Sequence, residues 1–284
     1  MKFELENANI KYAVIGDPVA HSVSPAMQNA AFMAAGRDER YGKFHVKPED
    51  LAEFVEFART HLAGFNATVP HKKMLLDLLD EVDPEAAAAG SVNTVAIKDG
   101  RLYGTSTDGY GLRSALHEAF GLTLTDARVL LLGAGGAAQA AAFEFVRHGA
   151  GELIIANRTV LKAEKLAAQL NIGNCRVSAI DIADHAAVSA AAAAADVVVQ
   201  ATSSGLHADD PPPVGLESLI SARAIFDMIY GTTKVLEFAR ENDIPCADGR
   251  AMLLHQGAAS FSLWTSQPAP LAAMRAALDR ALMK

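Results

Sequence analysis

Residues 129–138, VLLLGAGGAA, place a glycine-rich turn directly between an apolar strand and the start of a helix. A dinucleotide-binding fingerprint requires this context. Gly133 can make the tight turn, while Gly135 and Gly136 let backbone N–H groups approach a pyrophosphate. The helix N-terminus at Ala137 adds partial positive charge. The pattern is GxGGxA rather than GxGxxG, so a glycine turn without a nucleotide stays the alternative.

The next strand ends at Ala156 and continues as Asn157-Arg158-Thr159, about 20 residues after the glycine turn, where the ribose is usually recognised. An NAD site usually offers an acidic residue here, and this segment has none. Arg158, with Lys162 one turn further on, instead suits a 2′-phosphate. NADP is therefore favoured over NAD, with a solvated surface arginine as the alternative.

The sequence on both sides of this turn alternates short apolar strands with helical patterns. Strands so apolar are usually covered on both faces, which indicates a parallel, doubly wound sheet with helices on each side. The predicted strands are 129–132, 153–156, 177–180, 197–199 and 224–228, and the predicted helices between them include 137–148, 160–170 and the alanine run 190–195.

The first third of the chain also alternates strands and helices, which makes it a second α/β domain. Ser24 is placed as an N-cap with Pro25 at the first helical position, and Gly36 follows where a left-handed residue ends a helix. Asp99-Gly100 predicts a two-residue hairpin turn. The predicted strands are 12–15, 44–46, 65–69, 94–97 and 101–103, and the predicted helices are 51–62, 71–79, 110–120 and, at the end of the chain, 250–263 and 271–283.

Composition excludes several classes of protein. With 25 basic and 33 acidic residues the net charge is −8, which disfavours nucleic acid and anionic membranes as partners. No apolar run approaches the ~20 residues of a membrane helix, and the start does not resemble a signal peptide. Cys175 and Cys246 form no metal or disulfide pattern, and the nine histidines show no metal-ligand spacing. We expect a cytoplasmic protein without a metal.

Polar residues gather at element ends in the first domain. Ser22 and Ser24 flank a helix start, where two hydroxyls and free N–H groups could hold a carboxylate, although helix capping is the simpler interpretation. Asn66 and Thr68 are two apart along a strand, and Lys72 follows. Amide, hydroxyl and ammonium groups could thus converge on one polyol. Asn93 and the Thr107-Asp108 pair end neighbouring elements, where capping and turn roles are the alternatives.

Ordered motifs along nearly the whole chain resemble the shikimate dehydrogenase family. Together they are far more specific than any one of them. They are Gly16-Asp-Pro-Val-Ala-His-Ser-Val-Ser-Pro25, Asn66-Ala-Thr-Val-Pro-His-Lys72, Gly90-Ser-Val-Asn-Thr94, Ser106-Thr-Asp-Gly109, the Gly133 turn, Asn157-Arg-Thr159, Ala201-Thr-Ser203, Asp227-Met-Ile-Tyr230 and the segment from Gly249 through Gln256 to Thr265.

The resemblance implies reversible reduction of 3-dehydroshikimate to shikimate with NADPH. Lys72 matches the lysine that exchanges a proton with the C4 hydroxyl or carbonyl oxygen, and Asp108 matches its paired aspartate. Ser22 and Ser24 match the residues that hold the substrate carboxylate. The implied ring contacts are Asn66, Thr68, Asn93, Tyr230 and Gln256. The implied cofactor positions are Gly133, Ala134, Gly135, Gly136, Ala137, Asn157, Arg158, Thr159, Lys162, Thr202, Met228 and Gly249.

The resemblance also implies the domain organisation and the alternatives. A substrate-binding catalytic domain would span 1–109, with helices 250–284 returning to it, and an NADP-binding Rossmann domain would span 110–249. Ser106, Gln200 and a short loop after Tyr230 depart from the family pattern. Gln28 and the 255–257 run resemble the branch that accepts quinate. A quinate/shikimate dehydrogenase with relaxed cofactor choice and a non-catalytic binding paralogue are the alternatives. Whichever function holds, we expect the protein to be a monomer or a homodimer.

Overall fold

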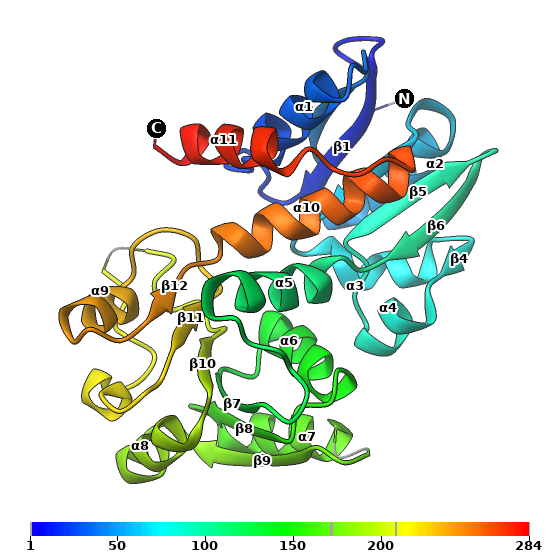
Figure 1. Ribbon diagram of the computed structural model, residues 1–284. Helices are drawn as coiled ribbons and strands as arrows, with labels where there is room; N and C mark the ends of the chain where they lie inside the picture. Colours follow the sequence, from blue (N-terminus) through cyan, green and yellow to red (C-terminus); the bar gives the residue numbers. More distant parts are fainter. Residues whose placement is uncertain (1, 171–172, 208, 284) are drawn as a thin grey trace. The chain divides into compact units, whose positions relative to one another are not determined.

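The computed structural model describes residues 2–170, 173–207 and 209–283, and these divide into two compact units (Figure 1). Unit 1 comprises residues 1–111 and 253–284, and unit 2 comprises residues 112–252. The chain passes between the units within α5 (Asp108–Phe120) and within α10 (Arg250–Thr265). No helix among the described residues is long and apolar enough to cross a membrane.

Unit 2 is built on a wholly parallel sheet, which confirms the predicted doubly wound fold. The order of its strands is β12-β11-β10-β7-β8-β9. Their bounds are β7 (Arg128–Leu132), β8 (Glu152–Asn157), β9 (Arg176–Asp181), β10 (Val197–Gln200), β11 (Ile225–Asp227) and β12 (Cys246–Ala247). The helices are α6 (Gly136–Arg147), α7 (Val160–Leu170), α8 (His185–Ala194) and α9 (Lys234–Glu241), with a 3₁₀ turn at Leu216–Leu219.

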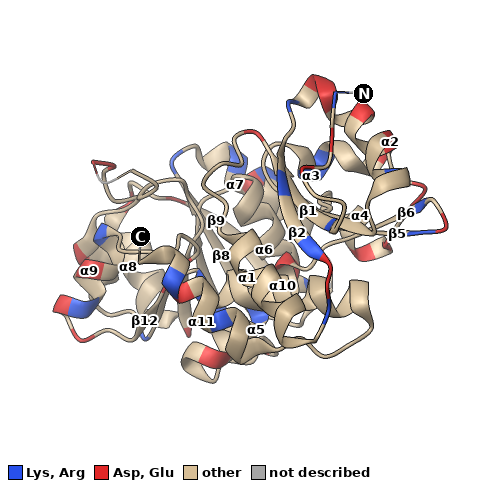
Figure 2. Ribbon diagram, turned by 90° about the horizontal axis from the view of Figure 1, so that it is seen from above, with Lys and Arg blue, Asp and Glu red and all other residues tan. Residues whose placement is uncertain are grey.

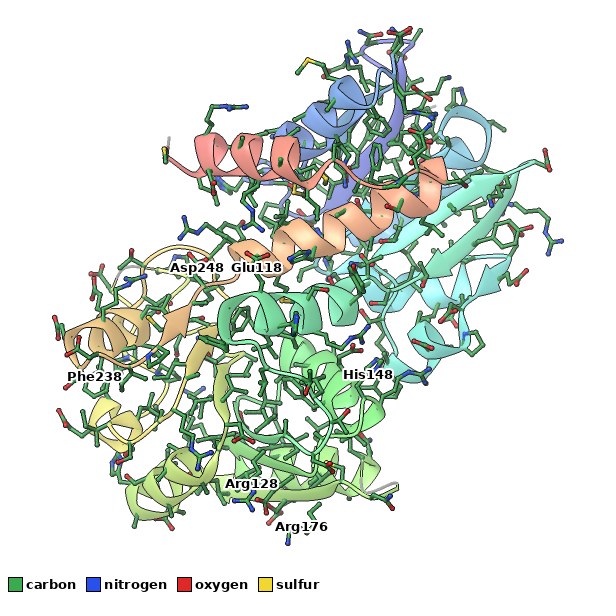
Figure 3. All side chains as sticks on the ribbon, in the orientation of Figure 1. Glu118, Arg128, His148, Arg176, Phe238 and Asp248 are labelled. Carbon is green, nitrogen blue, oxygen red and sulfur yellow. The ribbon has the colours of Figure 1, made fainter. Side chains whose placement is uncertain are left out.

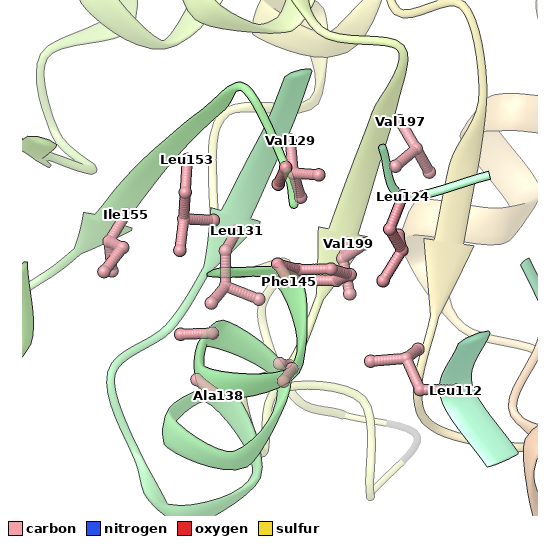
Figure 4. Packing of buried hydrophobic residues seen from close by; sticks show 14 of the residues in the cluster. Leu112, Leu124, Val129, Leu131, Ala138, Phe145, Leu153, Ile155, Val197 and Val199 are labelled. Atoms are coloured by element: carbon pink, nitrogen blue, oxygen red, sulfur yellow. The ribbon is translucent and has the colours of Figure 1, made fainter. Parts of the chain in front are cut away.

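Successive residues of each strand enter opposite cores, which explains why the strands are apolar throughout. Val129 and Leu131 pack with Phe145 of α6 and with residues of α5 and α7 on one face (Figure 4). Leu130 and Leu132 pack with α8 and α9 on the other face. Side chains alternate along a strand, so burial of both faces demands an unbroken apolar run.

Unit 1 is built on a mixed sheet with strand order β2-β1-β3-β5-β6-β4. The strands are β1 (Ile10–Gly16), β2 (Arg40–His45), β3 (Gly64–Ala67), β4 (Glu81–Val82), β5 (Thr94–Lys98) and β6 (Arg101–Thr105). The helices that belong to it are α1 (Ser24–Ala34), α2 (Leu51–His61), α3 (His71–Met74), α4 (Pro84–Ala89) and α11 (Leu271–Leu282), with 3₁₀ turns at Pro48–Asp50 and Leu75–Asp77.

The C-terminal helices complete the core of unit 1. Phe261 of α10 and Met274 of α11 pack with Phe32 of α1 against one face of the sheet, while α2 covers the other face. In Figure 1, α11 lies beside α1, although the two helices are far apart in sequence. These helices therefore pack back on the N-terminal part of the chain, as predicted.

Local expectations were wrong at several places. Ser24 already belongs to α1, and Val23 occupies the cap position without a side-chain cap bond. The strand predicted to reach Val69 ends at Ala67, and the helix predicted over 71–79 is one α-helical turn followed by a 3₁₀ turn. The prediction also missed α4, although Asp83 caps it and left-handed Gly90 ends it. Apart from the missed α4, these errors lie at element ends, where capping and tertiary packing decide the boundary.

Candidate active site

Lys72 and Asp108 form a direct pair in unit 1. Lys72 lies in the single turn of α3, and Asp108 is the first residue of α5. The Lys72 Nζ donates to Asp108 Oδ2 at 2.5 Å, and the two side chains are 31% and 16% exposed. The pair is thus accessible to a small molecule and partly shielded from water, and it offers a proton donor without a metal.

Asn93 holds the other oxygen of Asp108. Its Nδ2 donates to Asp108 Oδ1 at 2.8 Å, and its Oδ1 accepts from the Thr107 backbone N–H at 2.8 Å. A backbone N–H can only donate, so this contact fixes which way the Asn93 amide faces. Both carboxylate oxygens of Asp108 therefore accept hydrogen bonds.

Asn66 lies beneath this pair in a buried polar network. Its Nδ2 lies within hydrogen-bond distance of the Asn93 carbonyl oxygen (3.1 Å), Thr94 Oγ1 (2.9 Å) and Ser260 Oγ (3.0 Å). Its Oδ1 accepts from the Tyr41 hydroxyl at 2.7 Å. The protein itself thus occupies the polar atoms of Asn66, and sequence reasoning had not identified Tyr41, Thr94 or Ser260 as its partners.

Gln256 of α10 borders the same network, whereas other predicted substrate residues do not join it. Its Oε1 lies 3.4 Å from Asn93 Nδ2. In the described part of the chain, no hydrogen bond connects Ser22, Ser24 or Thr68 to these residues. Ser22 Oγ instead accepts from the Ser24 N–H at 3.4 Å, which keeps the two serines together at the start of α1.

In unit 2, the glycine turn from β7 into α6 has open space where a ligand would approach. Gly133 adopts φ +114°, which favours glycine, and a Cβ there would lie 3.1 Å from Thr202 Cγ2. At Gly135 and Gly136, an added Cβ would meet nothing within 4 Å. Ala134 is buried, but residues 135–137 are exposed, so the first-turn N–H groups of α6 can receive an anion.

Two exposed cations follow the neighbouring strand β8. Arg158 comes directly after Asn157, and Lys162 lies in the first turn of α7. Neither forms an ion pair with any residue that the structure describes. Asn157 Nδ2 donates to the Thr159 carbonyl at 2.9 Å, which shapes the turn between them. On the ribbon of Figure 2, acidic and basic positions are interspersed along the chain.

The loop after β11 carries Met228 and Tyr230. A Cβ at Gly249 would lie 2.2 Å from the Met228 carbonyl oxygen, so only glycine fits there. Tyr230 is 42% exposed. The Met228 N–H donates to the Gln200 carbonyl at 2.9 Å. The unusual Gln200 side chain donates to the Ser204 carbonyl at 3.0 Å, so it supports the loop after β10 that carries Thr202.

Asp227 anchors this loop from within the protein. It is fully buried, and it accepts from the Thr233 hydroxyl at 2.7 Å and from the Ile229 N–H at 3.0 Å. Burial raises the pKa of Asp227 to about 6, against the opposing effect of these hydrogen bonds. The negative charge of Asp248, labelled in Figure 3, raises that pKa further.

The geometry defines a class of protein. Unit 2 has the strand order of a dinucleotide-binding fold with two exposed cations after β8, and unit 1 holds an accessible lysine-aspartate pair. Among the described residues, no group of three or more His, Cys, Asp or Glu side chains could hold a metal ion. A dinucleotide-binding fold together with a lysine-aspartate pair is typical of a dinucleotide-dependent oxidoreductase.

The chain belongs to the shikimate dehydrogenase family. Residues 14–95 match the shikimate dehydrogenase substrate binding domain, residues 114–209 match shikimate / quinate 5-dehydrogenase, and residues 249–278 match the shikimate 5'-dehydrogenase C-terminal domain. A shikimate dehydrogenase (NADP(+)) of Geobacter metallireducens is 39% identical over 276 residues, which covers 95% of this chain and 96% of that protein.

Solved structures agree with this assignment. Shikimate 5-dehydrogenase of Thermus thermophilus, in complex with NADP(H) and shikimate, has a TM-score of 0.85 and 34% identity over 96% of this chain and 99% of that one. Quinate dehydrogenase of Corynebacterium glutamicum, in complex with NAD, has a TM-score of 0.84 and 29% identity over 95% of this chain and 99% of that one.

Proposed function

We propose that this protein catalyses the reversible, NADPH-dependent reduction of 3-dehydroshikimate to shikimate. The observation that carries the proposal is the 2.5 Å contact between Lys72 Nζ and Asp108 Oδ2. Reduction of a ketone places negative charge on its oxygen, so the site must deliver a proton within hydrogen-bond distance. Lys72 delivers that proton, and Asp108 orients the ammonium and accepts from the substrate hydroxyl.

The remaining substrate contacts come from residues around this pair. Ser22 and Ser24 bind the substrate carboxylate at the start of α1, and Thr68, Gln256 and Tyr230 contact the ring substituents. Asn66 and Asn93 are also proposed as ring contacts. Both are buried, and Asn93 in addition donates directly to Asp108. Lys72 and Asp108 argue against a non-catalytic paralogue, because a binding module needs no proton donor.

The residues of unit 2 fit NADP. An added Cβ would meet nothing within 4 Å at Gly135 and Gly136, which supports close approach of a pyrophosphate to the start of α6. Gly133, Ala134 and Ala137 complete that turn. When bound, NADPH supplies the hydride. Arg158 and Lys162 bind the 2′-phosphate as charge-assisted donors. Asn157 and Thr159 shape that loop, and Thr202, Met228 and Gly249 border the nicotinamide.

A quinate/shikimate dehydrogenase is the second candidate. Ser106 and Gln200 depart from the family pattern, and the similarity to a quinate dehydrogenase in complex with NAD favours testing it. The test measures reduced cofactor by absorbance at about 340 nm, with shikimate and quinate each assayed against NADP and NAD. Turnover confined to shikimate with NADP supports the proposal, whereas comparable turnover of quinate supports the second candidate. Absence of turnover in all four assays contradicts both candidate functions.

A cytoplasmic location and a monomeric or dimeric state stay predictions.

A further inference from the structure

One path of hydrogen bonds through the buried network of unit 1, from Asn66 through Thr94 and Asn93 to Asp108, has a defined donor direction. The Asn93 backbone carbonyl can only accept, so the Asn66 group that faces it at 3.1 Å is Nδ2. The same Nδ2 lies 2.9 Å from Thr94 Oγ1, which therefore accepts from it. The Thr94 hydroxyl in turn donates to Asn93 Oδ1 at 2.8 Å, and Asn93 Nδ2 donates to Asp108 Oδ1. The sequence of donors ends at Asp108.

Tyr41 of β2 supplies the first donor. Its hydroxyl donates to Asn66 Oδ1 at 2.7 Å. Burial raises the pKa of Tyr41 well above its ordinary value, so this hydroxyl keeps its proton. The charged side chain in contact with Asp108 is Lys72 of α3, and Tyr41 is the titratable group at the opposite end of the network. The hydrogen bonds from Tyr41 to Asp108 therefore keep the same donors and acceptors at every pH at which the enzyme would be assayed.

Ser260 connects α10 to this network. It is fully buried. Its Oγ donates to the Gln256 backbone carbonyl and accepts from Asn66 Nδ2, each at 3.0 Å, and it lies 2.9 Å from Thr94 Oγ1 and 3.3 Å from Thr107 Oγ1. One hydroxyl thus joins a helix from the end of the chain to β3, β5 and the residue before Asp108. Removal of a buried hydroxyl leaves its partners unsatisfied, which lets them change orientation.

We propose that Thr94 and Ser260 are positioning residues, which hold the Asn93 amide so that it donates to Asp108 Oδ1 while Lys72 occupies Oδ2. This inference rests on the proposed role of Lys72 and Asp108 at the substrate. Without the Thr94 hydroxyl, Asn93 Oδ1 keeps the Thr107 N–H as a donor but loses a second one, so its amide is less firmly held toward Asp108. A carboxylate that loses a hydrogen bond is less favoured over its protonated form.

The test uses two hydroxyl-deleting variants, Thr94→Val and Ser260→Ala. We expect kcat/KM for shikimate to fall by about 10- to 100-fold, with NADP affinity unchanged because its site lies in unit 2. The acid limb of the pH profile should move away from its wild-type position, to higher pH. Thr94→Ser, which keeps the hydroxyl, should restore the wild-type profile.

Thr265→Val is the matched control. The Thr265 hydroxyl lies on the same helix and donates to the Phe261 carbonyl at 2.8 Å, outside the network. This variant should keep the wild-type rate and pH profile. Thermal unfolding and circular dichroism of every variant separate loss of fold from loss of positioning. Ser260→Ala removes a single oxygen, so it provides the test if Thr94→Val does not fold.

Two results would overturn the inference. In the first, the pH profiles of Thr94→Val and Ser260→Ala, scaled to the same maximum rate, have the same acid limb as the wild-type profile. The hydroxyls would then be only structural. The other is an equal shift of the pH profile in Thr265→Val. Lys72→Ala, assayed in parallel, separates this inference from the proposed function. Full activity of Lys72→Ala contradicts the proposed function, whereas an inactive Lys72→Ala with unshifted Thr94→Val contradicts the positioning role alone.

Discussion

Replacement of the buried Asp227 by asparagine should change how the stability of the protein depends on pH. The pKa of this carboxyl is raised from 3.8 to about 6, chiefly by burial. The folded protein therefore binds the proton more tightly than the unfolded chain does. This tighter proton binding stabilises the folded protein. The stabilisation is fully present at pH values below the pKa of Asp227 in the unfolded chain, and it is lost as the pH rises through about 6.

The magnitude follows from the size of the shift. A difference of about two pKa units corresponds to about 3 kcal/mol between the acid and alkaline limits. Between pH 5 and pH 8, the wild-type protein loses about 1.4 kcal/mol of this stabilisation. The asparagine side chain carries no charge at either pH, so the stability of the variant does not change for this reason. The free energy of unfolding of Asp227→Asn, minus that of wild type, should rise by about 1.4 kcal/mol over this range.

The assay is urea denaturation followed by circular dichroism at several pH values between 5 and 8. His71, whose pKa is lowered by burial, is present in both proteins, so its contribution cancels in the difference. Asp210→Asn is the matched control. Backbone N–H groups of His207 and Gly205 lower the Asp210 pKa, so this carboxyl stays ionised throughout the range. The free energy of unfolding of Asp210→Asn, minus that of wild type, should therefore not change with pH. A flat difference for Asp227→Asn as well would refute the reasoning.

Three further substitutions test the proposed site. Lys72→Ala should lower kcat by roughly 10² to 10⁴ while NADPH affinity stays near wild type, as steady-state rates and cofactor titration would reveal; an unchanged kcat removes Lys72 from proton transfer. Arg158→Ala should weaken NADPH binding by about 1.5 to 3 kcal/mol and barely affect NADH, as measured by fluorescence titration; equal losses contradict a contact with the 2′-phosphate. Gly249→Ala should destabilise by about 1 to 3 kcal/mol in urea, because its Cβ would overlap the Met228 carbonyl oxygen, and an unchanged midpoint contradicts this.

The architecture of unit 2 could be predicted because its signals are local. An unbroken apolar strand indicates burial on both faces, and the strand-to-glycine-to-helix order of residues 129–138 defines one turn geometry. The hairpin at Asp99-Gly100 was likewise predictable, since both residues adopt positive φ there. Short elements such as β4 and β12 carry too few residues to show a period, and they were missed.

Residue type and near neighbours are enough to predict the alternating elements and the glycine turn. Lys72 and Asp108 became candidates through the motifs that resemble the shikimate dehydrogenase family. Only the tertiary structure decided how these residues are held. Ser260 meets Asn66 across 194 residues of chain, and Tyr41 meets the same amide from another strand. Helical or strand periodicity indicates which face a residue occupies, but not which group lies opposite it. Such partners form only when α10 packs on the sheet of unit 1 and buries their polar atoms together.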